Sequence, residues 1–205
     1  MADNIFSRYN RDETIRSIYF FDDCDVLANK LGVKDEKILI ALEQDLTNHR
    51  LAELSEEPLK GHFGIAHLKN IHKYIFQDIY PFAGKFREED IWKGDTFFCK
   101  SQFIYQVTEE LLKKLKAEKF LTGLGSIDFS KRAAIYMAEL NMIHPFREGN
   151  GRTIREFIRC LALKCGYIID WSLVDSQKLL KDSIISVDNN YGPLADCLYK
   201  SIDNK

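Results

Sequence analysis

The residues HPFREGNGRTIR (144–155) stand apart from the rest of this 205-residue chain. They gather an imidazole, a carboxylate, a carboxamide, two glycines and three arginines in one short run. Gly149 and Gly151 flank Asn150, just ahead of an apolar helix expected from about Arg152 to Cys165, which closes with a glycine. Backbone N–H groups in such a loop can converge on one point, and a helix N-terminus attracts anions. The pattern predicts an anion hole suited to phosphate.

Charged side chains around this loop predict chemistry on a polyphosphate. Arg152 and Arg155 are three residues apart at the start of the helix, so both can reach over the same anion, and arginine suits phosphate oxygens. Glu148 is the loop carboxylate, placed to hold Mg²⁺ against the phosphates. Pro145 should end the preceding helix at His144, which then faces an incoming hydroxyl as a general base.

Each of these residues also has an ordinary structural interpretation. Arg152 or Arg155 alone could be a surface or ion-paired arginine, and Glu148 could simply pair with an arginine. Phe146 is most simply an apolar plug that anchors the loop to the core. We interpret the remaining histidines as helix caps or buried groups with partners: His49, His62, His67 and His72.

Outward from the loop, apolar residues recur with a period near 3.6 and there are only four prolines, so we expect a mostly helical protein. Ser130 is the expected N-cap of the helix that ends at His144, with a buried face through Ala133, Ala134, Met137, Leu140 and Ile143. An apolar stripe through Ile38, Leu39, Ala41, Leu42 and Leu46 marks another helix. This helix is expected over residues 35–46, and further helices are expected over residues 63–79, 102–120 and 194–202.

One segment, residues 81–101, departs from the helical pattern. Two β-favouring runs, Ile91-Trp92 and Thr96–Cys99, surround Lys93-Gly94-Asp95, which predicts a short hairpin with its turn at Gly94. The alternative is a plain connector that Phe97 or Phe98 pins to the helices.

Composition excludes several classes of protein. The net charge is −2, so no long nucleic-acid track or anionic membrane is indicated. No apolar run is long enough for a membrane span, and the first residues lack a signal-peptide core. The five cysteines form no C-x-x-C pair, which argues against a disulfide framework or a zinc site and suits a reducing cytoplasm.

The 144–155 run resembles the signature of the Fic family, H-x-F-x-[DE]-G-N-G-R-x-x-R, at every fixed position. Residues 63–87 resemble the helix-and-turn segment found upstream in that family, and residues 93–98 lie where the family carries its flap. The resemblance covers roughly residues 60–200. It implies an all-α Fic helical bundle with a short β-hairpin flap, as a single domain over 1–205 in which residues 1–59 form an N-terminal helical extension.

The resemblance implies protein adenylyltransferase activity, with AMP passing from ATP to a tyrosine, threonine or serine hydroxyl of a target protein. His144 would take the hydroxyl proton, and Glu148 would hold Mg²⁺ on the α- and β-phosphates. Asn150 would line the anion hole with the backbone of Gly149 and Gly151. Arg152 and Arg155 would secure the β- and γ-phosphates. Thr96 and Phe97 of the flap would dock the target in extended form.

The resemblance also suggests how the activity is regulated. Many Fic proteins carry an inhibitory motif, Ser/Thr-x-x-x-Glu-Gly/Asn, yet no glutamate of this chain has a serine or threonine four residues before it. We therefore expect a toxin restrained by a separate small antitoxin that supplies Ser-x-x-x-Glu. The chain resembles small stand-alone toxins that modify type II topoisomerase subunits, which makes such a subunit a candidate target. The protein would act in the bacterial cytoplasm or, after export as an effector, in another cell.

Two alternatives stay open. The chain could be a nucleotide-binding interaction module without turnover, or a Fic transferase of another donor such as UMP or phosphocholine. Gly151 stands where relatives that phosphorylate carry lysine, which favours AMP. Direct nucleic-acid binding has the least support, because the positive charge is a cluster aimed at one anion rather than a stripe.

Overall fold

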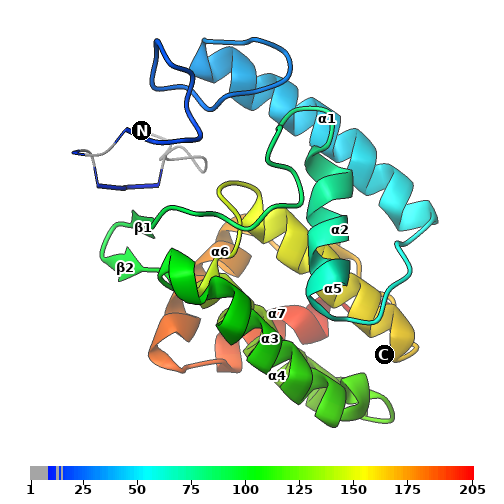
Figure 1. Cartoon of the computed structure of the whole chain (residues 1–205). Helices are drawn as coiled ribbons and strands as arrows, with labels where there is room; N and C mark the ends of the chain where they lie inside the picture. The colour runs from blue at the N-terminus through cyan, green and yellow to red at the C-terminus, as the bar shows by residue number, and fades with distance from the viewer. Residues whose placement is uncertain (1–8, 13, 15) are drawn as a thin grey trace.

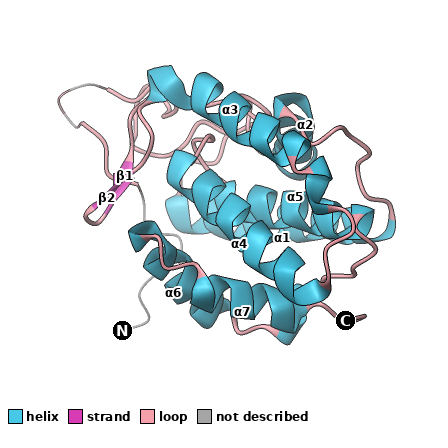
Figure 2. Ribbon diagram, turned by 90° about the horizontal axis from the view of Figure 1, so that it is seen from below, coloured by secondary structure: helices cyan, strands magenta, loops and turns pink. Residues whose placement is uncertain are grey.

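The computed structural model describes residues 9–12, 14 and 16–205, and helices dominate this part of the chain (Figures 1 and 2). The prediction of an all-α bundle with a short hairpin is confirmed. The helices are α1 (Glu36–Glu56), α2 (Ile65–Phe76), α3 (Ile104–Ala117), α4 (Ser126–Ile143), α5 (Asn150–Lys164), α6 (Ser176–Ile185) and α7 (Gly192–Ser201).

Helices α4 and α5 form the centre of the bundle (Figure 2). α5 packs against α2 and α4, while α4 also packs against α3 and α7. All five residues of the predicted apolar face of α4 are buried, and α5 buries Ile154, Phe157, Ile158 and Leu161 completely. The N-terminus of α5, which carries the second half of the signature, is therefore held by a close-packed core.

The predicted start of α4 is wrong and its predicted end is confirmed. The helix begins at Ser126, after Gly125, and Ser130 lies inside it with its hydroxyl donating to the Ser126 carbonyl over 2.8 Å. The earlier start brings Phe129, fully buried, into the core, which explains why the helix extends beyond Ser130. At the other end, the helix stops before His144, whose φ of 49° is left-handed.

Helix α1 buries a different face from the predicted one. It begins after Asp35, whose carboxylate accepts from the Ile38 N–H, but it continues to Glu56. Ile38 of the predicted stripe is 54% exposed. The buried positions of α1 are Leu39, Glu43, Thr47 and Leu54. Glu43 and Thr47 are buried because both contact Arg152 of the signature.

Helix α6 was not predicted, since its pattern is weak. Only Leu179 and Asp182 of this helix are buried, while Leu180 and Ile184 are exposed. Its start is set by Asp175, whose side chain accepts from the Lys178 N–H.

The predicted hairpin is present as β1 (Trp92–Lys93) and β2 (Thr96–Phe97), which projects from the bundle at the left of Figure 1. Trp92 pairs with Phe97 and Lys93 with Thr96. Gly94 begins the turn with a φ of 56°, which glycine adopts without a steric cost.

The sequence argued against a disulfide framework and against a membrane span. The five cysteines are all free thiols, and Cys160 and Cys197 are buried. Across the described residues, no helix combines the length and the apolar character that crossing a bilayer requires.

Burial of His67 on α2 makes the stability of the fold dependent on pH. Its ring lies between those of Phe63 and Phe157, its Nε2 is 3.0 Å from the Leu59 carbonyl, and desolvation lowers its pKa below the ordinary 6.5. The unfolded chain therefore takes up a proton below pH 6.5 that the folded chain does not, so His67 contributes stability above pH 6.5 that is lost as the pH falls.

We expect the wild type to lose about 1 kcal/mol more unfolding free energy between pH 7.5 and 5.5 than His67→Phe does. Denaturant titrations at the two pH values measure this difference. Ile71→Val changes a buried residue of the same helix without removing a titratable group, so it is the control and should keep the wild-type pH dependence. Equal losses in His67→Phe and the wild type would contradict the expectation.

Candidate active site

The loop between α4 and α5 is shaped by the side chain of Asn150. Its Nδ2 donates to the Phe146 carbonyl over 2.7 Å, and its Oδ1 accepts from the Phe146 N–H over 2.9 Å. Asn150 is only 1% exposed, so its amide holds the loop in place, and the exposed lining comes from the backbone. The first N–H groups of α5 have no acceptor within the helix, which leaves them directed at the predicted anion hole.

Gly149 is required by both conformation and space. Its φ is 78°, and a Cβ at this position would lie 2.0 Å from Cζ of the buried Phe76. The Gly149 carbonyl accepts from both the N–H and the hydroxyl of Thr153, which fixes the first turn of α5. Close contact with Phe76 therefore presses the loop against α2.

Phe146 and His72 support the loop from beneath. Phe146 is fully buried, as predicted for a plug, and stacks on the His72 ring with centroids 3.9 Å apart. His72 Nδ1 accepts from the Gly84 N–H over 2.8 Å, and Nε2 donates to the Glu148 carbonyl over 3.0 Å. Burial lowers the pKa of His72 to about 3, so this histidine is a neutral structural group.

His144 has the geometry of a neutral general base. Its Nδ1 is 3.0 Å from the Asn141 carbonyl. A carbonyl oxygen can only accept a hydrogen bond, so Nδ1 carries the proton of the neutral ring and Nε2 carries the lone pair. The ring stacks on Phe98 with centroids 3.9 Å apart. Burial lowers the pKa of His144 to about 3. Nε2 lies 2.8 Å from the hydroxyl of Tyr9, so it already faces a hydroxyl of the chain itself.

The two arginines predicted to share one anion differ in their surroundings. Arg152 forms an ion pair with Glu43 and donates to the Thr47 hydroxyl over 2.9 Å, both on α1. In the described ranges no carboxylate pairs with Arg155, and burial together with the charge of Arg152 lowers its pKa to about 10. Arg155 is thus the signature arginine whose charge is left for an incoming anion.

Gly151 keeps Arg155 close to the start of α5. A Cβ on Gly151 would lie 3.3 Å from Arg155 Nη1, so a larger residue here would push the guanidinium away. Because Gly151 has no side chain, Arg155 can lie on the same side of the helix as the first backbone N–H groups of α5.

Glu148 is buried close to a second carboxylate, Glu43, and to two arginines, Arg152 and Arg147. Burial first, and then the charge of Glu43, raise its pKa, while Arg152 lies 4.0 Å away and the Gly149 N–H donates to the carboxylate over 2.9 Å. Glu43 is already paired with Arg152, so Glu148 is the carboxylate of this group that would face a cation. Mg²⁺ takes one or two carboxylates plus phosphate oxygens, so this oxygen donor set fits the ion.

Arg87 connects the catalytic loop to the flap, and sequence reasoning missed this role. Its guanidinium donates to the carbonyls of His144 over 2.8 Å, of Ile143 over 3.3 Å and of Cys99, and its backbone N–H donates to the Pro145 carbonyl. Arg87 is 2% exposed. The available signal was its place at the end of the 63–87 segment that resembles the Fic family.

The flap pairs with another segment of the described chain along β1. Trp92 exchanges two backbone hydrogen bonds with Asn10, of 2.8 and 3.0 Å. Thr96 and Phe97 lie on the other strand, and Phe97, 70% exposed, stacks on Trp92 with centroids 5.5 Å apart. The structure brings the flap next to His144 through Phe98, while docking by Thr96 and Phe97 stays a prediction.

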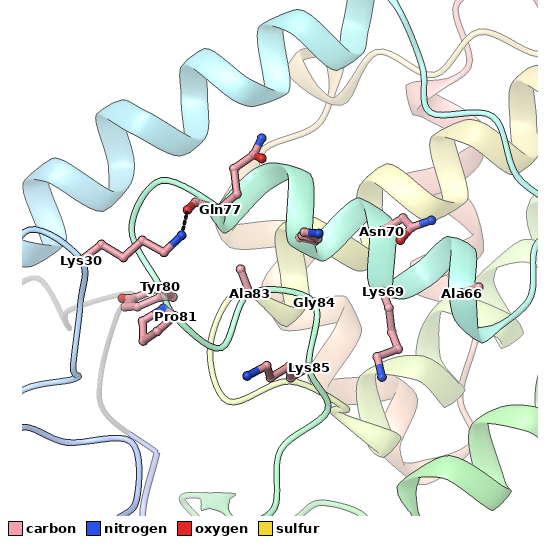
Figure 3. A pocket seen from close by; sticks show the side chains of 11 residues that line it. Lys30, Ala66, Lys69, Asn70, Gln77, Tyr80, Pro81, Ala83, Gly84 and Lys85 are labelled. Atoms are coloured by element: carbon pink, nitrogen blue, oxygen red, sulfur yellow. Dashed lines mark hydrogen bonds between the residues drawn. The ribbon is translucent and has the colours of Figure 1, made fainter.

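One cavity formed by described residues lies away from this chemistry. It has a volume of about 440 Å³ and lies between α2 and the following turn, where Lys30 donates to the Gln77 carbonyl (Figure 3). No signature residue lines it, whereas a cavity of about 60 Å³ includes Glu43, Arg147 and Glu148. The site is therefore identified by its side chains and by the helix terminus.

Comparisons with known proteins agree with this geometry. A family model described as the Fic/DOC family matches residues 62–162. Protein adenylyltransferase VbhT of Bartonella schoenbuchensis is 43% identical over 80% of this chain, which spans 34% of VbhT. The "Probable protein adenylyltransferase Fic" of Escherichia coli is 35% identical over 79% of this chain and 80% of its own length.

A solved structure shows the same fold with a nucleotide. The N-terminal Fic domain of a VirB-translocated Bep effector protein of Bartonella quintana, with bound ADP, is similar with a TM-score of 0.83. It is 28% identical, and the match covers 90% of this chain and 94% of that domain.

Proposed function

This chain belongs to the Fic/DOC family and is an enzyme related to protein adenylyltransferases, and we propose that it transfers AMP from ATP to a hydroxyl group of a protein. The observation that carries the proposal is the lone pair of His144 Nε2, which faces a hydroxyl beside the N-terminus of α5. In this proposal the general base, the anion hole and a Mg²⁺ ion at Glu148 would act together in attack on a phosphate.

In the proposed reaction, His144 takes the proton of the acceptor hydroxyl at Nε2. Its Nδ1–H bond to the Asn141 carbonyl keeps the ring in the accepting tautomer, and stacking on Phe98 fixes its plane. The acceptor oxygen attacks the α-phosphorus of ATP, and pyrophosphate leaves. Positioning of these groups supplies most of the rate enhancement in nucleotidyl transfer.

The phosphates are proposed to bind at the start of α5. The backbone N–H groups around Gly149, Asn150 and Gly151 face the negative oxygens, and Arg155 neutralises the terminal phosphates. Arg152 is held by Glu43, so its part is to fix the site and to balance the charge of Glu148. Glu148 would hold Mg²⁺, which would supply positive charge to balance the phosphates.

A labelling experiment tests the proposed function. The purified chain is incubated with Mg²⁺ and ATP labelled at the α-phosphate, with and without a bacterial lysate, and protein-bound label is measured. We expect covalent AMP on protein, no label from ATP labelled at the γ-phosphate, and no transfer when Mg²⁺ is chelated. Absence of protein-bound AMP under all conditions would support a nucleotide-binding module instead.

Arg155→Ala is expected to weaken ATP binding about tenfold to a hundredfold, because it removes an arginine cation that has no competing carboxylate in the described ranges. Calorimetry with a non-hydrolysable ATP analogue measures this change. Arg155→Lys should keep part of the affinity, and replacement of the exposed Lys131 by alanine is the surface-charge control. Unchanged affinity in Arg155→Ala would remove this arginine from the phosphate site.

Regulation by a separate small antitoxin is part of the proposal. The described chain brings no glutamate to Arg155, and a partner that supplies Ser-x-x-x-Glu beside it would neutralise the charge that the terminal phosphate needs. The free chain would then be a toxin acting in the cytoplasm or after export as an effector, with a type II topoisomerase subunit as a candidate target.

A further inference from the structure

Tyr9 occupies the position that an acceptor hydroxyl needs. Its oxygen lies 2.8 Å from Nε2 of His144, although the two residues are 135 positions apart in the sequence. Because His144 Nδ1 is committed to the Asn141 carbonyl, the hydrogen bond runs from the Tyr9 O–H to Nε2. This is the hydrogen bond that precedes proton transfer to a general base.

The backbone next to Tyr9 is held in extended form by the flap. Asn10 donates to the Trp92 carbonyl over 2.8 Å and accepts from the Trp92 N–H over 3.0 Å, as an antiparallel pair at the outer edge of β1. A residue adjacent to such a pair points toward the neighbouring face of the strand. Pairing at Asn10 therefore sets the direction in which Tyr9 enters the site.

The Tyr9 ring contacts both the flap and the loop between α4 and α5. Its centroid is 5.1 Å from that of His144 and 6.0 Å from that of Phe98, both in edge-to-face geometry. Lys93 Nζ and Arg147 Cζ each lie 5.9 Å from the ring centre. These contacts come from the flap and from the loop, so the ring is oriented as well as the hydroxyl.

Other tyrosine hydroxyls of the described chain bond away from His144. Burial raises the pKa of Tyr9, and the charge of Glu148 adds to this effect, so its phenol stays protonated until a base removes the proton. His144 is the base within reach. The Tyr191 hydroxyl bonds to the carboxylate of Glu139 and to the side-chain amide oxygen of Asn189. Backbone groups or carboxylates are the partners of the hydroxyls of Tyr19, Tyr74, Tyr80, Tyr136 and Tyr167.

We infer that Tyr9 is an intramolecular acceptor, which the chain modifies with AMP before or in competition with a target protein. This inference rests on the proposed adenylyltransferase function. The Tyr9 oxygen forms a bond to the α-phosphorus of ATP, while the bond from that phosphorus to the oxygen bridging to the β-phosphorus breaks. Pyrophosphate leaves with the electron pair, and the phenolic proton passes to Nε2 of His144.

The expected result is one AMP group on the peptide that contains Tyr9. The full chain is incubated with Mg²⁺ and ATP, and modification is followed by intact mass and peptide mapping. The rate per chain should not depend on protein concentration, since the acceptor is already in the site. Tyr9→Phe should lose this modification, whereas Tyr105→Phe, which alters an exposed tyrosine, should retain it.

The backbone pair supplies a second test that leaves the phenol in place. Asn10→Pro removes the N–H that donates to the Trp92 carbonyl and should slow modification of Tyr9 about fivefold to tenfold. Asn10→Ala keeps the N–H and should modify Tyr9 at the wild-type rate. Equal rates in the proline and alanine variants would show that pairing with β1 does not present Tyr9.

Transfer to lysate proteins separates this inference from the proposed function. In Tyr9→Phe that transfer should persist and rise, because the competing hydroxyl is gone. If the wild type labels lysate proteins while Tyr9 stays unmodified, or if Tyr9→Phe labels itself like the wild type, the inference is overturned and the proposed function stands. If no protein receives AMP, both are overturned.

Discussion

Replacement of His144 by alanine is expected to lower the rate of AMP transfer about 10²-fold to 10⁴-fold while ATP still binds. The reason is geometric, since Nε2 of His144 faces the Tyr9 hydroxyl, and the groups proposed to bind the phosphates belong to α5 and not to His144. Incorporation of α-labelled AMP measures transfer, and calorimetry measures ATP binding.

His49→Ala, at an exposed histidine of α1, is the matched control and should transfer at the wild-type rate. His144→Asn provides a second variant, because it retains a polar side chain beside Phe98 but no basic nitrogen. If either His144 variant transfers AMP at near wild-type rates, His144 is not the base. A loss of ATP binding equal to the loss of transfer would assign it to the nucleotide site instead.

Gly149→Ala is expected to cost about 3–4 kcal/mol of unfolding free energy and to reduce transfer at least about a hundredfold. The added Cβ meets the Phe76 ring at 2.0 Å, and the residue must keep a φ of 78°. Both effects displace the loop that positions His144 relative to the start of α5. Denaturant unfolding and the transfer assay measure the two effects.

Gly123→Ala separates the two causes of this loss. Gly123 has a φ of 84°, but a Cβ there would meet no atom within 4 Å, so its cost should be about 1 kcal/mol from backbone strain alone. Phe76→Leu shortens the ring side chain that blocks the Cβ, and the double variant with Gly149→Ala should lose less stability than the two single losses added together. Equal costs for the two alanine variants would rule out the Phe76 contact as the constraint.

Much of the fold was predictable because its signals are local. The helix ending before Pro145, the glycine after the last turn of α5 and the turn at Gly94 each depend on backbone preferences of a few adjacent residues. The errors occurred where local preference was weak or overruled. Ser130 is a good cap by residue type, yet burial of Phe129 moves the start of α4 to Ser126.

The sequence by itself determined which candidate groups the loop carries, because His144, Glu148, the glycines and Arg155 lie within one short run. Only the tertiary structure decided which partners these groups meet. Glu43 binds Arg152, Arg87 bonds the His144 carbonyl, and Tyr9 faces His144 Nε2. These residues are far apart along the chain, so close packing of the helices and pairing at the flap bring them together, and no local pattern specifies such contacts.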